Sequence, residues 1–397
     1  MIHYSCKYAP IELFAAFGEE ACLLDREEEN FECAEALTHA NLCCHAKSLI
    51  QQSLDKRNVI IMDCCDSLRR VYDVLDFKGN QEHLYLLDLP HENNGCAREL
   101  FAGILLNLVH DLERSTGRSF NTELFIQACA QASWEFLQED FIALLGGRVS
   151  PELEASIAGN MSLPIANLTC CGSRGLEPLP EGAQSLSLEE LMDWYAHALL
   201  RMVPCMRMTD VSGRRVLFEN PYLKGIIYNT VKFCDFYSFD YSALKDETDL
   251  PMLKIESDYM PMAQGQLSTR LEAFSESLGL DARQQTNEKV FNMQGTYYAG
   301  IDSGSTTTNM VVLDKEGAVV ASAIVRTGPK AERGAREALE AVCEQLGATE
   351  KDFAAIMATG YGRDNIPFAT DTRTEISCHA HGAHYLNPEI RTIVDIG

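Results

Sequence analysis

Basic side chains are scarce in the sequence: 33 Lys and Arg residues stand against 58 Asp and Glu residues, for a formal net charge of −25. Such an acidic surface repels the phosphates of nucleic acids and of anionic membranes, so we expect no nucleic acid and no membrane as partner. The N-terminus lacks a basic stretch followed by an apolar run, and the longest apolar run, around residues 101–109, is too short to cross a bilayer. The sequence therefore predicts a cytoplasmic protein that binds anionic ligands in local basic pockets.

Paired cysteines with C-x-x-C spacing are also lacking, although 15 of the 397 residues are cysteine. That spacing is typical of zinc ribbons, so its absence disfavours this class of site. Three Cys-Cys doublets occur instead, at residues 43–44, 64–65 and 170–171. Because disulfides are rare in the cytoplasm, we expect the cysteines to be metal ligands or buried thiols.

The first part of the chain alternates short apolar strands with helices. Residues 59–62, 84–89 and 225–228 are apolar runs typical of buried strands, and residues 97–115 form a long amphipathic helix. This alternation predicts an α/β fold with a doubly wound parallel sheet. In such sheets ligands bind at the carboxyl ends of the strands.

A polar segment without an apolar period, residues 281–294, is interpreted as a linker. It divides the chain into two predicted regions, 1–290 and 296–397. Behind it, strands are expected at 297–301 and 310–313.

A turn rich in Gly, Ser and Thr, residues 302–308, connects these two strands. Glycine lets the backbone approach a phosphate closely, and successive N–H and hydroxyl groups cradle it, while an aspartate binds Mg²⁺ directly or through water. This is not a P-loop, because no G-K-[ST] ends the turn and no helix follows. An ordinary polar hairpin is the alternative, although a shorter turn would suffice for it. The predicted site for ATP with Mg²⁺ is Asp302, Gly304, Ser305, Thr306 and Thr307.

Residues 300–314 resemble the first phosphate loop of the ATPase superfamily that includes actin, sugar kinases and heat-shock chaperones. Within it, they resemble the activators of 2-hydroxyacyl-CoA dehydratases and benzoyl-CoA reductases. Residues 359–363, 375–380 and 392–397 are similar to later motifs of these activators, in the same order. The resemblance implies a partial actin-like (ribonuclease H-like) ATPase domain, with Gly360 at the nucleotide.

The same resemblance implies an iron–sulfur cluster. In these activators a [4Fe–4S] cluster bridges two identical subunits, and Cys378 matches one of its ligands. Asp395, a further implied nucleotide contact, lies in the family's Asp-Ile-Gly-Gly motif, within which the sequence stops at Gly397. We therefore expect a truncated ATPase segment. Asn309 replaces the lysine usual in these activators, which affects only a peripheral charge contact.

The first part resembles a second family, the 2-hydroxyacyl-CoA dehydratase subunits, which include benzoyl-CoA reductase subunits. Its motifs occur in order over nearly all of this part, at residues 4–13, 39–43, 65–70, 87–91, 225–238, 255–259 and 265–270. The resemblance implies that Cys43, Cys65 and Cys234 are the ligands of a [4Fe–4S] cluster. Weaker candidates are Cys6, Cys170, Cys171 and Cys205.

The residue types around these cysteines suit thiolates, because nearby cations and helix N-termini lower the pKa of a thiol. Lys47 and Arg69 follow Cys43 and Cys65 by four residues, on the same predicted helix faces. Arg69 is also a candidate for a CoA phosphate, together with Arg70 and Arg270. Helix-face salt bridges are the alternative for each arginine.

Glu12 is the predicted catalytic residue, as a proton relay or outer ligand near the cluster, with a surface carboxylate as the alternative. The family reaction removes water from a 2-hydroxyacyl-CoA to give an enoyl-CoA. ATP hydrolysis on the activator drives a low-potential electron onto the dehydratase cluster, and the resulting ketyl radical expels the hydroxyl group. The implied partners are an acyl-CoA, a second dehydratase subunit or a second copy of the chain, and an activator-type dimer around a bridging cluster. Alternatives are a double-cubane-type reductase, benzoyl-CoA reduction and a non-catalytic scaffold.

Overall fold

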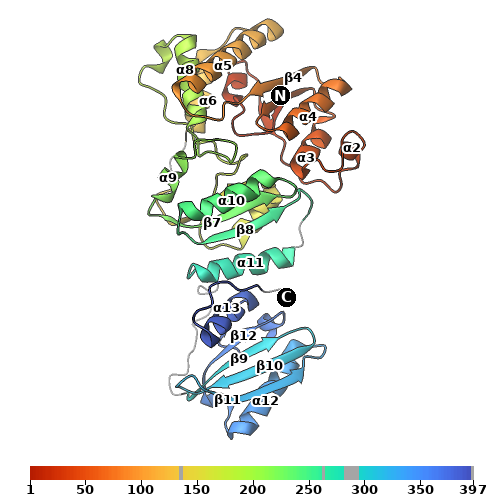
Figure 1. Cartoon of the computed structure of the whole chain (residues 1–397), viewed down its shortest axis with the longest axis vertical. Helices are drawn as coiled ribbons and strands as arrows, with labels where there is room; N and C mark the ends of the chain where they lie inside the picture. Colours follow the sequence, from red (N-terminus) through yellow and green to blue (C-terminus); the bar gives the residue numbers. More distant parts are fainter. Residues whose placement is uncertain (134–136, 262–263, 281–294, 395–397) are drawn as a thin grey trace. The chain divides into compact units, whose positions relative to one another are not determined.

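The computed structural model describes residues 1–133, 137–261, 264–280 and 295–394 (Figure 1). Contacts divide the chain into a first unit, Met1–Gly159 with Leu163–Ala263, and a second unit, Asn160–Ser162 with Gln264–Gly397. The predicted linker and Asp395 lie outside the described residues, so the predicted region limits at 290 and 296 stay predictions.

The first unit contains two four-stranded parallel sheets. One has the order β2-β1-β3-β4 and the other the order β6-β5-β7-β8. The strands are β1 (Ile2–Tyr4), β2 (Ala21–Leu23), β3 (Asn58–Asp63), β4 (His83–Asp88), β5 (Phe141–Gly146), β6 (Ile165–Asn167), β7 (Leu223–Val231) and β8 (Met252–Ser257).

Helices connect these strands and cover the sheets, and α10 packs on β7 and β5 (Figure 1). The helices of the first unit are α1 (Ile11–Ala15), α2 (Glu32–Glu35), α3 (Cys44–Ser53), α4 (Asp66–Lys78), α5 (Gly95–Thr116), α6 (Thr122–Ala132), α7 (Pro151–Gly159), α8 (Leu188–Leu200), α9 (Gly213–Phe218) and α10 (Asp235–Glu247).

Strand β3 explains why the first sheet is covered on both faces. Its alternate side chains enter two different cores: Val59 and Ile61 pack with residues of α3 and α4, whereas Ile60 and Met62 pack with residues of α1, α5 and α8. A strand buried on both faces reads as a continuous apolar run, which is why the sequence identified it. The prediction of a doubly wound α/β fold is confirmed.

The second unit is built on a five-stranded sheet of order β11-β10-β9-β12-β13. Strands β9, β10 and β11 are antiparallel neighbours, whereas β12 is parallel to β9 and β13 is parallel to β12. This mixed order is that of the predicted ribonuclease H-like fold. The elements are β9 (Tyr297–Ser303), β10 (Thr307–Leu313), β11 (Val319–Arg326), β12 (Phe353–Thr359), β13 (Asp371–Thr372), α11 (Gln264–Ser277), α12 (Ala331–Leu346) and α13 (Glu375–Leu386).

The hairpin turn between β9 and β10 is tighter than predicted. Ser303 pairs with Thr308 in the β-ladder, so only residues 304–306 lie between the strands. The predicted turn of residues 302–308 is wrong in this respect, because its polar ends continue the strand pairing. Asp302 is thereby fixed in β9.

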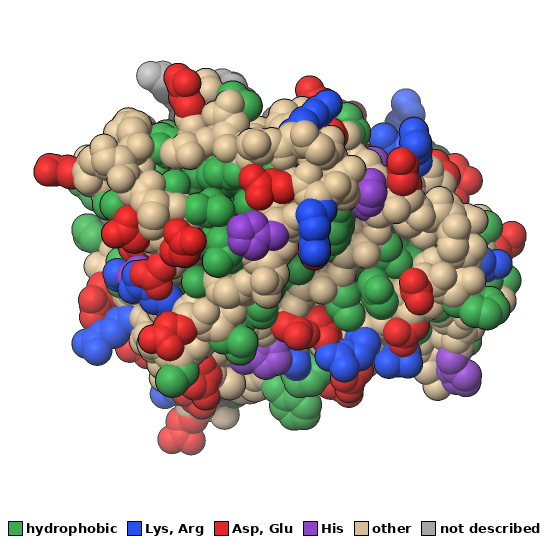
Figure 2. All heavy atoms as spheres, turned by 90° about the horizontal axis from the view of Figure 1, so that it is seen from above, with side chains coloured by type: hydrophobic (Ala, Val, Ile, Leu, Met, Phe, Trp, Pro, Cys, Tyr) green, Lys and Arg blue, Asp and Glu red, His purple; other side chains and the backbone are tan. Residues whose placement is uncertain are grey.

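The surface agrees with the mixed but acidic composition. On the face drawn in Figure 2, Lys and Arg side chains are scattered among Asp and Glu and form no continuous basic area among the residues drawn there. Over the described ranges, no helix is long and apolar enough to cross a membrane.

Candidate functional site

The three predicted cluster ligands occupy equivalent positions, each immediately before a helix. Cys43 is the N-cap residue of α3, Cys65 of α4 and Cys234 of α10, and all three have extended backbone angles. Cys65 and Cys234 also follow the carboxyl ends of the parallel strands β3 and β7. The partial positive charge of a helix N-terminus favours a thiolate over a thiol.

The thiols differ in how readily they lose a proton. Burial raises the pKa of Cys43, and it raises that of Cys234 to about 11. The pKa of Cys65 is lowered to about 7, mainly because the Cys64 thiol donates a hydrogen bond to it. The charge of Cys65 raises the pKa of Cys43 and of Cys234, so the three thiols lie within electrostatic range of one another.

This geometry brings the three predicted ligands into one neighbourhood without completing a metal site. Over the described part of the chain, no three Cys, His, Asp or Glu side chains converge closely enough to hold one metal ion. The ligand set therefore stays a prediction. Within the doublet at residues 64–65, the lowered pKa of Cys65 agrees with its choice as the thiolate.

The cations expected beside these thiols bind carboxylates instead. Lys47 Nζ lies 2.7 Å from Glu35 Oε1, and Arg69 forms an ion pair with Asp63. The cation that lowers the pKa of Cys65 is Arg207, which the sequence reasoning missed because it comes from a distant loop. Spacing on a helix therefore did not predict the partners of Lys47 and Arg69.

A second thiol group comprises Cys6, Cys64, Cys170, Cys171 and Cys205, and all of them except Cys64 interact electrostatically with the buried Lys7. Lys7 Nζ donates to the carbonyl oxygens of Leu168 (3.2 Å) and Val203 (2.7 Å). The sulfur atoms of Cys170 and Cys171 are 3.7 Å apart. The pKa of Cys170 is lowered to about 6, first by a hydrogen bond from Cys171, with Lys7 acting in the same direction.

Arg148 is the second buried cation beside these thiols, and it is fully buried with 0% exposure. Among the described residues, none of its three guanidinium nitrogens has a hydrogen-bond partner. Its Cζ lies 4.6 Å from the ring centroid of Tyr259, whose φ of +62° is unusual for a non-glycine residue. A buried guanidinium without a partner is costly, so this position fits a negatively charged group such as a thiolate-bound metal cluster.

Glu12, the predicted catalytic residue, lies in a buried hydrogen-bonded network. Its carboxylate accepts a hydrogen bond from Arg174 Nη2 at 2.7 Å and another from the Tyr195 hydroxyl. Arg174 also donates to the carbonyl oxygens of Lys7 and Ala9. The network connects the segment after β1 to α8, and a catalytic role for Glu12 stays a prediction.

The predicted CoA-binding arginines are separated in the chain's architecture. Arg69 is exposed and paired with Asp63, and Arg270 is half-buried on α11 in the second unit. Arg70, the third of these arginines, borders a groove of about 760 Å³ between α4 and the segment after α2. It forms an ion pair with Asp73 (2.6 Å), which lines the same groove together with Lys78 and the exposed Phe77.

In the second unit, the two predicted phosphate-binding segments meet. Gly360 has a φ of +88°, and a Cβ there would lie 2.6 Å from Asp302 Oδ1 and from the carbonyl oxygen of Ser303. Gly362 N donates to Ser303 O at 2.9 Å. Only glycine permits this close approach of the loop after β12 to the end of β9.

Two buried oxygens at this junction lack partners. Among the described residues, Asp302 Oδ1 and Ser303 Oγ have no hydrogen-bond partner. Buried polar atoms are normally satisfied, so the junction fits a ligand that supplies a cation or donors, as Mg²⁺ with a phosphate would. Gly304, Ser305, Thr306 and Thr307 form the adjoining turn, and Thr327 Oγ1 donates to Gly304 O at 2.8 Å.

Cys378 lies half-buried on α13 near the same junction. Burial raises its pKa, and the charges of Glu276 and Asp302 act in the same direction, whereas the Thr359 hydroxyl opposes them. The predicted cluster cysteine is therefore within electrostatic range of the predicted magnesium ligand.

Comparison with protein families assigns both parts of the chain. The family model of the 2-hydroxyglutaryl-CoA dehydratase D-component matches residues 6–133 and 149–278, about two thirds of the chain. The chain belongs to this dehydratase D-component family. The model of the BadF/BadG/BcrA/BcrD ATPase family matches residues 299–397 and so includes the hairpin and Cys378. The family resemblances seen in the sequence are confirmed for both parts.

Two curated relatives each match about a quarter of this D-component family member. The activator of lactoyl-CoA dehydratase of Anaerotignum propionicum is 41% identical over 101 residues, which are 25% of this chain and 39% of the relative. The (R)-2-hydroxyglutaryl-CoA dehydratase activating ATPase of Acidaminococcus fermentans is 37% identical over 102 residues, again 25% and 39%. The crystal structure of (R)-2-hydroxyglutaryl-CoA dehydratase component A from the same organism has 35% identity, covers 26% of this chain and 40% of that one, and gives a TM-score of 0.24. This chain spans about 40% of the length of these relatives.

Proposed function

We propose that the chain takes part in ATP-dependent, low-potential electron transfer to a [4Fe–4S] centre that dehydrates a 2-hydroxyacyl-CoA to an enoyl-CoA. The observation that carries this proposal is the shared placement of Cys43, Cys65 and Cys234 at three helix N-termini in a chain of the dehydratase D-component family. A bound cluster would supply a one-electron donor with an iron open to a substrate oxygen.

The protein's own groups would hold such a cluster and balance its charge. The first-turn amides of α3, α4 and α10 favour the three thiolates. Arg148 would provide the positive charge that a cluster with net negative charge needs, since its guanidinium has no partner among the described residues. In the second unit, Asp302 would bind Mg²⁺, and the turn 304–307 with Gly360 would hold the phosphates.

The groove beside α4 would bind the nucleotide end of the acyl-CoA. Arg70 and Lys78 would contact phosphates, and Phe77 offers a face on which an adenine stacks. Arg69 and Arg270 remain the alternatives predicted from the sequence. A substitution of Lys78 by Gln that leaves CoA affinity unchanged contradicts this assignment.

Anaerobic iron and acid-labile sulfide analysis of the full chain tests the cluster. We expect about four irons per chain, and loss of that iron in each of C43A, C65A and C234A. C33A is the matched control, because Cys33 is exposed and belongs to neither thiol group. Iron that persists in the three variants refutes the ligand set.

A second candidate function, a double-cubane-type reductase, is favoured by the second thiol group around Lys7. Five further thiols with two buried cations would suit a larger cluster. About eight irons per chain, with partial loss in C170A and C205A, would support this candidate over the dehydratase. A chain without iron supports the scaffold, and a substrate assay separates 2-hydroxyacyl-CoA dehydration from benzoyl-CoA reduction.

A further inference from the structure

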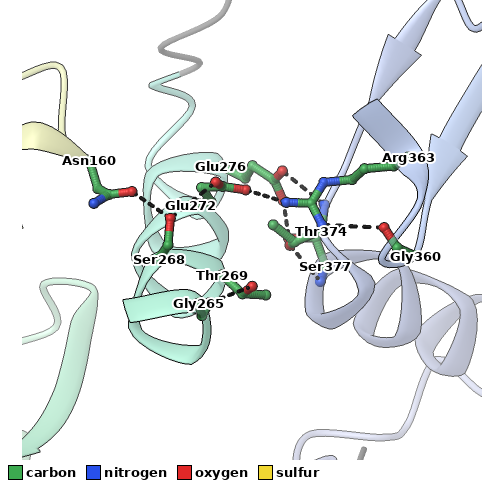
Figure 3. Close-up of polar contacts among 10 residues, drawn as sticks. All are labelled: Asn160, Gly265, Ser268, Thr269, Glu272, Glu276, Gly360, Arg363, Thr374 and Ser377. Carbon is green, nitrogen blue, oxygen red and sulfur yellow. Dashed lines mark hydrogen bonds and ion pairs between the residues drawn. The ribbon is translucent and has the colours of Figure 1, made fainter. Parts of the chain in front are cut away.

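Helix α11 belongs to the dehydratase segment by sequence but to the second unit by its contacts. It lies within the D-component match, which ends at residue 278, whereas contact grouping assigns Gln264–Gly397 to the second unit. Its two carboxylates, Glu272 and Glu276, are one helical turn apart and point toward the ATPase segment (Figure 3).

Glu272 binds the loop that approaches the phosphate turn. Arg363 Nη2 lies 2.5 Å from Glu272 Oε2, and the Arg363 side chain is only about 10% exposed. The other end of the guanidinium, Nη1, donates to Gly360 O. Arg363 thus fixes the glycine that packs against Asp302, and Glu272 fixes Arg363.

Glu276 binds the start of the helix that carries Cys378. Its carboxylate accepts hydrogen bonds from Thr374 N (3.0 Å) and Thr374 Oγ1 (2.9 Å), and Thr374 is 1% exposed. Thr374 is the N-cap of α13, and its hydroxyl accepts from Ser377 N at 3.3 Å. A carboxylate at this end also interacts favourably with the helix dipole.

We propose that Glu272 and Glu276 are positioning residues that make α11 the coupling element between nucleotide binding and the dehydratase segment. One rigid helix anchors both the loop at the phosphate turn and the helix of the predicted cluster cysteine. A ligand that moves Gly360 therefore acts on Glu272 through Arg363, and the response of α11 acts on α13 through Glu276. This coupling rests on the proposed nucleotide site, and it is reciprocal by thermodynamic necessity.

Hydrogen–deuterium exchange of the full chain without nucleotide tests the positioning. In E272Q we expect about tenfold faster exchange in residues 359–365, and in E276Q a similar increase in the first turn of α13. E340Q is the matched control, because Glu340 is exposed on α12 away from these contacts. The charge-swapped pair E272R with R363E should restore slow exchange in the loop. Exchange in both variants equal to that of E340Q overturns the proposal.

Exchange with Mg²⁺ and ADP tests the coupling. In the wild-type chain we expect ADP to slow exchange in α11 as well as in the loop, and E272Q should lose the effect in α11 while the loop still responds. ADP binding without any change in α11 overturns the coupling. If the wild-type chain does not bind ADP, both the proposed nucleotide site and the coupling are refuted. In that case the exchange measured without nucleotide still decides whether the two glutamates position the loop and α13.

Discussion

The substitution of Glu12 by Gln distinguishes a structural from a chemical role for this carboxylate. Glu12 is 3% exposed and neutralises Arg174, whose side chain is 9% exposed. The amide of Gln keeps the shape but removes the charge, which leaves Arg174 buried without a counter-ion. Arg174 also donates to the carbonyl oxygens of Lys7 and Ala9 and to the Tyr195 hydroxyl, none of which carries a net charge.

The magnitude follows from the burial of both partners. Removal of one member of a buried ion pair costs about 3–5 kcal/mol. For a unit of this size, each kcal/mol lowers Tm by about 2–4 °C, so E12Q should lower the Tm of the first unit by about 10 °C. Thermal unfolding followed by circular dichroism measures this decrease.

Two further variants make the test specific. E99Q changes an exposed glutamate on α5 and should alter stability by less than about 0.5 kcal/mol. The double variant E12Q with R174M removes the unpaired charge and should recover part of the lost stability. If E12Q unfolds like E99Q, Arg174 does not depend on Glu12, and the carboxylate is available for the predicted proton relay.

Three other predictions follow from local geometry and pKa. A Cβ at Gly360 would lie 2.6 Å from Asp302 Oδ1 in β9, whereas Gly347 also has positive φ but open space around it. G347A should therefore lower the free energy of unfolding by about 1 kcal/mol, and G360A should lower it clearly more. Thermal unfolding measures both decreases, and equal decreases would contradict the close contact at Gly360. In the metal-free chain, the rate at which iodoacetamide modifies Cys65 should be half-maximal near pH 7, because its pKa is about 7. The rate for Cys234, whose pKa is about 11, should be half-maximal only near pH 11. Peptide mass spectrometry measures both rates, and identical pH profiles for the two cysteines refute this difference. Burial lowers the pKa of His45 to about 3 from 6.5, so its contribution to stability is complete above pH 6.5 and is lost as the pH falls toward 3. Urea midpoints across that window should fall less steeply for H45Q, and an unchanged slope would exclude His45 as the cause.

The sequence predicted the elements that have local causes. Strand β3 was identifiable because both its faces are buried, and α5 because its apolar residues repeat with helical spacing. The positions of Cys65 and Cys234 follow from the same logic, since the residue between a parallel strand and its helix lies at the ligand-binding edge of the sheet. These features are determined by residues that are close in the sequence, so they can be predicted from a single sequence.

The partners of charged side chains were not predictable in this way. Lys47 and Arg69 were expected beside cysteines, but Glu35 and Asp63 bind them, because carboxylates compete better than thiols for a cation. The contact between Arg363 and Glu272 joins residues 91 positions apart. No local pattern marks such a pair, and nothing in the sequence around Arg148 indicates that its guanidinium is buried without a hydrogen-bond partner among the described residues.

Each of the two candidate sites has buried polar groups without hydrogen-bond partners among the described residues, a cation in the first and oxygen atoms in the second. In the first unit, the fully buried Arg148 has no hydrogen-bond partner within the described ranges and therefore calls for an anion. In the second unit, the buried oxygens Asp302 Oδ1 and Ser303 Oγ have no hydrogen-bond partner among the residues described there, and they fit a cation or a donor. The proposed iron–sulfur centre would supply the negative charge in the first unit, and the proposed magnesium nucleotide would supply the cation in the second. It follows that removal of Mg²⁺ by a chelator should abolish nucleotide binding in the second unit while leaving the iron content of the first unit unchanged.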